Sequence, residues 1–166
     1  MEFNGAISTL PKEIRIFVAS FVVVLSIGFY TGLLFVNETS SASSKGIEEN
    51  YLGNEDDEDA EVMKFKKSDR EMLTIVHTHI LSMSMIFFLL GILVWMTDIS
   101  KRLKLFLTVE PFLSVILTFG GIYFLWNGVV WMKYVVIFSG MLMTLTFVVS
   151  SFVVLYKLTQ KSAPVH

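Results

Sequence analysis

The chain has 166 residues, of which 54% are hydrophobic, 14% aromatic and only 17% charged. A soluble domain of this length cannot bury so much apolar surface, so the composition indicates a membrane protein. The net charge of -2 leaves no broad basic surface for nucleic acid. Because the chain has no cysteine, disulfides, iron–sulfur clusters and thiolate zinc sites are excluded.

Four apolar runs are each long enough to cross a bilayer as a helix, which takes about 20 residues for a core of about 30 Å. The expected spans are residues 16–36, 72–97, 103–126 and 131–156. Pro11 ahead of the first span and the pair Ser68 and Glu71 ahead of the second are typical of helix starts. We therefore expect an all-α integral membrane protein folded as a four-transmembrane-helix bundle.

A polar connector, residues 37–71, separates the first span from the second. It opens with serine and threonine, continues with an acidic run from Glu55 to Asp59, and ends with a basic patch between Lys64 and Arg70. This composition is typical of a solvated, partly flexible linker, and the order of its carboxylates does not fit a calcium loop. We expect a long acidic loop here.

The orientation follows from the basic residues near the short connections, since these favour the cytoplasmic side. The turn after the second span and the C-terminal tail carry Lys101, Arg102, Lys104, Lys157 and Lys161. Residues 1–15 and 157–166 are therefore expected in the cytoplasm and the acidic loop outside it. The patch from Lys64 to Arg70 argues the other way, but a loop of this length counts for less. The pattern favours a bacterial inner (cytoplasmic) membrane protein with both termini inside.

Two histidines in the second span, His77 and His79, are the first candidate site residues, because ionisable groups at membrane depth are costly. Residues two apart point about 200° apart on a helix. Both rings therefore cannot chelate one metal from a regular helix, and we expect one ring to face the bundle interior.

Glycines of the other three spans lie at a depth similar to that of the histidines. These are Gly28, Gly32, Gly120, Gly121 and Gly140. Glycine leaves room for a neighbouring helix or for a flat ligand. One interpretation is a haem b or metal site with His77 or His79 as a ligand and Met141, Met143 or a second protomer's histidine as the other. The other is helix packing, at Gly120 and Gly121 among others, with the imidazoles bonded to hydroxyls or to interfacial water. A proton or quinone site is a third.

Glu110 is the second candidate, near the cytoplasmic end of the third span and followed by Pro111. It either pairs with Arg102 or Lys104, or serves as a proton-carrying or partner-binding carboxylate. The serine and threonine hydroxyls of the spans can bond to their own helix, so each carries little information alone.

The pattern favours a small, non-catalytic integral subunit of a larger membrane assembly, of a respiratory or electron-transfer kind, because no soluble part is large enough for a catalytic domain. Its expected partners are membrane lipid and other membrane subunits or a second copy of the chain. The alternatives are an electron carrier that binds haem b or a metal through His77 or His79, and an oligomeric proton or ion conductor that uses Glu110. The layout resembles the small haem-b bundles of respiratory membranes in architecture alone, since those carry ligand histidines on two helices.

Overall fold

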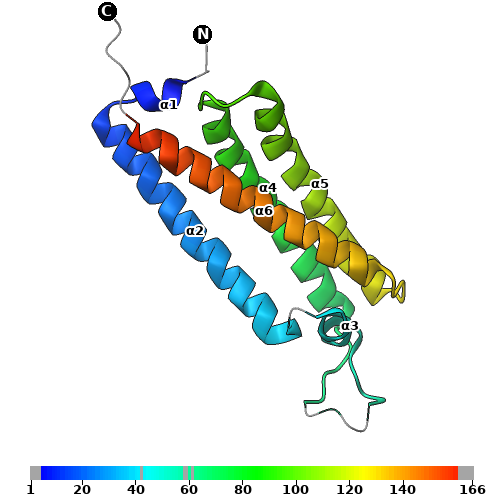
Figure 1. The fold of residues 1–166 in the computed structure, drawn as a ribbon. Coiled ribbons are helices and arrows are strands. Elements are labelled where there is room, and N and C mark those ends of the chain that lie inside the picture. The colour runs from blue at the N-terminus through cyan, green and yellow to red at the C-terminus, as the bar shows by residue number, and fades with distance from the viewer. Residues whose placement is uncertain (1–4, 42, 58–59, 61, 161–166) are drawn as a thin grey trace, which may run out of the picture.

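The computed structural model describes residues 5–41, 43–57, 60 and 62–160, and every element in this part of the chain is a helix. Four helices are long and apolar enough to cross a membrane, which confirms the predicted all-helical fold with four spans. Figure 1 shows them lying side by side along one general direction. In chain order the elements are α1 (Ala6–Thr9), α2 (Lys12–Ser40), α3 (Ser44–Leu52), α4 (Asp69–Trp95), α5 (Lys101–Trp126) and α6 (Met132–Thr159).

The long helices begin where the sequence places their caps. Pro11 precedes the first residue of α2. At α4, the side chain of Ser68 accepts a bond from the backbone of Glu71 while the Glu71 carboxylate accepts one from the backbone N–H of Ser68, so the predicted capping box is present. Helix α2 extends four residues beyond its predicted span at both ends, while α4 begins and α6 ends three residues beyond theirs. A helix can continue into water after the apolar run has ended.

Helices α5 and α6 pack along a seam, which we define by their buried residues. On α5 these residues repeat at intervals of three and four, from Lys104 through Leu107, Pro111, Ser114, Thr118 and Gly121 to Leu125. This repeat is the one that keeps one face of a helix against a neighbour. Near the middle, the hydroxyls of Thr118 and Ser139 are 2.7 Å apart, and a Cβ on Gly121 would lie 2.9 Å from a Val136 methyl carbon. Small residues thus bring the two backbones close together.

Helix α2 is peripheral and contacts α6 and, at its C-terminal end, α3 (Figure 1). Before its last two residues, Thr39 and Ser40, which are covered at the connector, the partly covered side chains of α2 end at Phe29. The ring of Phe29 stacks on that of Phe147 at 3.9 Å between centroids. Phe147 also meets Phe87 of α4 edge-on at 6.2 Å. Beyond this aromatic contact, every residue of α2 from Tyr30 to Glu38 is exposed. The bundle is therefore a compact group of α4, α5 and α6, with α2 attached through its first two-thirds.

The connector differs from the expected loop because its first part is helical. Helix α2 continues to Ser40, and α3 follows after a tight corner at which Gly46 meets the Ser40 carbonyl. The Glu48 carboxylate of α3 pairs with Lys133 of α6 at 2.6 Å. Further on, Lys64 donates to the last-turn carbonyl of Thr39 at 3.0 Å, which places a cation at the negative end of α2. The acidic residues Glu58, Asp59 and Glu61 lie outside the described residues.

The opposite end of the bundle gathers α1, the start of α2, the α4–α5 turn and the end of α6 (Figure 1). Two backbone bonds, from Gly5 N–H to Thr97 O and from Ile7 N–H to Met96 O, tie α1 to the end of α4. In the same turn, Asp98 pairs with Lys157 of α6 at 2.7 Å, and this hydrogen bond lowers the pKa of the Asp98 carboxyl below its usual value. We call this the terminal end and the end with α3 the connector end.

Candidate functional site

The two histidines of α4 occupy different sides of the helix, and both are exposed. The ring of His79 stacks on Phe119 of α5, with 4.8 Å between centroids, and its Nδ1–H donates to the carbonyl of Ile75 at 2.8 Å. His77 shares the outward face of α4 with Leu73 and Leu81, which are both 60% exposed. We predicted that one of the two rings faces the bundle interior. His79 comes closer to this than His77, because its ring contacts α5 although it remains exposed.

The candidate second ligands divide between surface and core. Met141 is 68% exposed on α6, whereas Met143 is 6% exposed in the seam. Together with the exposed histidines, Met141 would place a haem or metal on the outside of the bundle rather than within it. In the part of the chain that the structure describes, no group of three or more His, Asp or Glu side chains is arranged to hold a metal ion.

The glycines predicted to lie at the same depth as the histidines have two kinds of surroundings. Gly121 packs closely against Val136, as the packing interpretation predicts. At Gly28, Gly32, Gly120 and Gly140, no atom of a neighbouring element among the described residues lies within 4 Å of the position a Cβ would take. These four glycines therefore leave open space at the surface of the chain instead of meeting one another around a shared cavity.

Glu110 lies on α5 with one oxygen bonded and the other buried. The hydroxyl of Ser114, one turn further along, donates to Oε1. Oε2 is buried and has no hydrogen-bond partner among the described residues. Lys104, which sequence reasoning offers as a partner for Glu110, donates instead to the carbonyls of Trp95, at 3.0 Å, and Thr97. A buried carboxylate oxygen without a donor is costly in a low-dielectric medium, which singles this residue out.

Sequence reasoning missed the row of hydroxyls that accompanies Glu110 along the seam. The structure buries Ser114, Thr118, Ser139, Thr146, Ser150 and Ser151 between the helices. Each hydroxyl is uninformative alone, but Ser114 and Thr118 lie four residues apart on α5, and Ser139, Thr146 and Ser150 lie seven and four residues apart on α6. That repeat is the signal that would have placed them on one buried face.

A family model described as a transmembrane helical domain, Aq_1264_TM, matches residues 41–165. The matched region begins directly after α2 and contains α3, α4, α5 and α6. No curated protein and no solved structure is significantly similar to the chain. The chain is a membrane protein that belongs to the Aq_1264_TM family of transmembrane helical domains.

Proposed function

We propose that the protein is a small, non-catalytic subunit of a larger membrane assembly, and that the exposed part of α2 is where another membrane helix joins it. The observation that carries this proposal is the open face around Gly28 and Gly32. The two glycines are four residues apart, so they share one face of α2. In the part of the chain that the structure describes, no atom of another element lies within 4 Å of a Cβ placed at either glycine.

Lipid alone accounts poorly for this face. Small residues four apart allow a second helix to approach so closely that van der Waals contacts and backbone interactions favour association over lipid. The polar residues support the same view, because His77 and His79 are exposed on α4 at a comparable distance from the connector end. An imidazole that faces hydrocarbon is costly, whereas one covered by a partner helix can be bonded.

The same proposal includes the orientation. Lys101 and Arg102 are exposed at the terminal end, so the positive-inside rule favours that end, with both termini, on the cytoplasmic side. The connector end then faces away from the cytoplasm, and a bacterial inner membrane is the location that we favour. Electron-transfer assemblies are the class that the exposed histidines favour.

Size measurement in mild detergent tests the assembly. We expect the wild-type chain to purify with a partner subunit or a second copy, and the variant Gly28→Leu with Gly32→Leu to run as a single chain of 18.8 kDa plus detergent. The matched control is Gly140→Leu, which adds the same side chain at an open glycine of α6. A wild-type chain that is alone in mild detergent, or a double variant that keeps its partner, would contradict the proposal.

A second candidate, proton conduction by an oligomer, is favoured by the buried Oε2 of Glu110 and by the hydroxyls that follow it along the seam. Hydroxyls can relay protons between hydrogen-bond partners, and a carboxylate at membrane depth can take one up. We expect proton flux into liposomes that Glu110→Gln abolishes, because the amide cannot carry the proton. The control is Glu38→Gln, an exposed residue near the end of α2. Undiminished flux in Glu110→Gln would exclude this function.

A further inference from the structure

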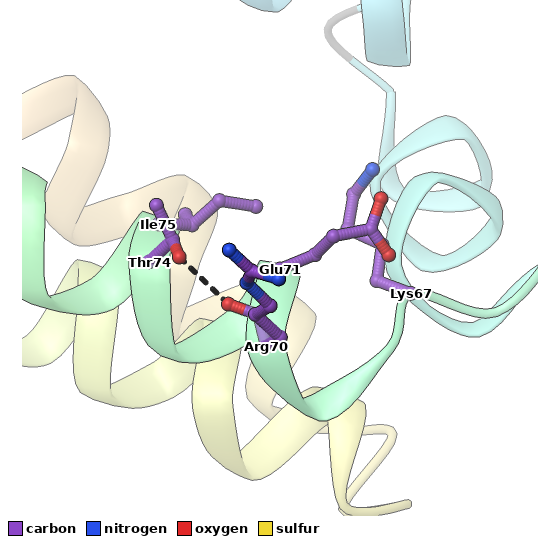
Figure 2. A pocket seen from close by; sticks show the side chains of 5 residues that line it. All are labelled: Lys67, Arg70, Glu71, Thr74 and Ile75. Atoms are coloured by element: carbon purple, nitrogen blue, oxygen red, sulfur yellow. Dashed lines mark hydrogen bonds between the residues drawn. The ribbon is translucent and has the colours of Figure 1, made fainter.

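The basic patch that ends the connector surrounds a hollow of about 290 Å³ at the start of α4. The hollow is lined by Lys67, Arg70, Glu71, Thr74 and Ile75. Figure 2 shows Lys67 just before α4 and the other four residues on its first two turns. None of the functions considered above uses these residues. From this geometry we infer that the hollow binds the headgroup phosphate of an anionic phospholipid in the leaflet at the connector end.

The hollow lies where a lipid phosphate would be. Its polar residues precede the apolar run of α4, and Thr74 and Ile75 belong to the first turn of that run. Phosphates form the layer immediately outside the hydrocarbon core. Trp126, an aromatic residue typical of this layer, lies beside the hollow and donates from its indole N–H to the carbonyl of Lys67 at 2.8 Å.

The cations of the hollow are available. Within the described part of the chain, the Lys67 ammonium and the Arg70 guanidinium form no ion pair and no hydrogen bond, although the Lys67 charge interacts at longer range with the Glu71 carboxylate. The Glu71 carboxylate is engaged by Ser68, whose N–H and hydroxyl donate to Oε2 at 2.8 and 2.7 Å. The three charges sum to one positive charge, which complements the single negative charge of a phosphodiester.

The segment that carries these cations is held in place before any lipid arrives. The backbone of Lys67 is fixed on both sides, because its N–H donates to Tyr51 O at 3.3 Å and its carbonyl accepts from Trp126. The ammonium of Lys66 lies 5.1 Å above the Trp126 ring. Arg70 follows in the first turn of a helix that the capping box has already started. A site that is already ordered loses less entropy when it binds.

An acyl chain has a surface to follow from the hollow. Leu73, on the same helix between Arg70 and Thr74, is 60% exposed, and Ile75 forms an apolar wall of the hollow. A phospholipid would therefore contact cations at its phosphate and apolar side chains at its tail. Free phosphate would contact only the cations, so the phospholipid should bind more tightly than free phosphate.

Native mass spectrometry of the full chain, freed of lipid in mild detergent, tests this inference. We expect phosphatidylglycerol to bind more tightly than phosphatidylcholine, and Lys67→Gln with Arg70→Gln to weaken phosphatidylglycerol binding by about 10- to 30-fold, since each basic residue near a membrane surface contributes measurably. Glycerol 3-phosphate should not compete at concentrations at which phosphatidylglycerol saturates the site.

Two further variants make the result specific. Lys101→Gln with Arg102→Gln removes two exposed cations at the terminal end and should leave binding at this site unchanged. Glu71→Gln keeps a side chain that can complete the capping box and raises the charge of the hollow, so it should tighten binding. Equal binding by wild type and Lys67→Gln with Arg70→Gln, or full competition by glycerol 3-phosphate, would overturn the lipid site. None of these variants changes a residue of α2. The lipid-binding measurement and the size measurement of the assembly can therefore succeed or fail independently of each other.

Discussion

Replacing Lys104 with methionine is expected to lower the free energy of unfolding by about 2–4 kcal/mol, because a hydrogen bond from a charged donor contributes more than a neutral one. Lys104 is only 4% exposed although it stands in the first turn of α5. Its ammonium donates to the carbonyls of Trp95 and Thr97 and lies 5.8 Å from the centre of the Trp95 ring. It therefore ends α4 by satisfying carbonyls that have no partner within that helix.

Methionine keeps the length of the lysine side chain, so the change removes the charge and the donors while filling a similar volume. Unfolding in detergent, followed by helix content and by tryptophan fluorescence, measures the loss. Lys101→Met is the matched control, because Lys101 lies one turn earlier on the same helix and is exposed. Equal stability of the two variants would show that the Lys104 bonds contribute little.

Replacing Gly46 with alanine is expected to destabilise the chain by about 2–3 kcal/mol, the range of an unrelieved overpacking change. A Cβ at this position would lie 1.9 Å from the backbone oxygen of Ser40 and 2.6 Å from its carbonyl carbon. No side-chain rotation can relieve a clash with backbone, so α3 has to move away from the end of α2. That movement strains the Glu48–Lys133 ion pair and uncovers Ile47, which is 8% exposed.

Trypsin gives a direct measurement of this movement, because Lys45 precedes Gly46 within α3. Cleavage after Lys45 requires local opening of the helix, so a loss of about 2 kcal/mol should raise the cleavage rate by about 30-fold. Ser44→Ala tests for a general effect of alanine at this helix start, since it adds no new atoms at the corner. A Gly46→Ala protein that resists trypsin like wild type would contradict the predicted clash.

The parts of the fold that depend on local chemistry could be predicted from the sequence. Apolar runs of bilayer length gave four spans, and the capping pair Ser68 and Glu71 gave the start of α4 within one residue. Pro11 likewise marked the start of α2. These signals act over one or two helical turns, so no knowledge of the tertiary structure is needed to interpret them.

The parts that depend on contacts between distant segments could not be predicted in this way. Lys104 counted in the sequence as a cytoplasmic charge, but it is buried because the end of α4 supplies carbonyls for its ammonium. Helix α3 resembled a polar linker, since its order comes from contacts such as the one between Glu48 and Lys133, 85 residues apart. At the candidate site, chain order predicts how far along each helix His77 and His79 lie, but not whether Gly28 or Gly140 would meet another helix.

The peripheral position of α2 has a consequence for the order in which the protein is made. Helix α2 is synthesised before α4 and α5, whereas α6, which it contacts, is synthesised after them. The Arg15 guanidinium donates to the carbonyl of Leu158, 143 residues later in the chain, and the Phe29 ring stacks on that of Phe147. Neither contact can form until α6 has been synthesised. Helices α4, α5 and α6 are joined by short turns, so they can pair in sequence as they are synthesised. During that interval α2 stands in the bilayer without its contacts to α6, so a partner helix of the kind that we propose would meet it before α6 does.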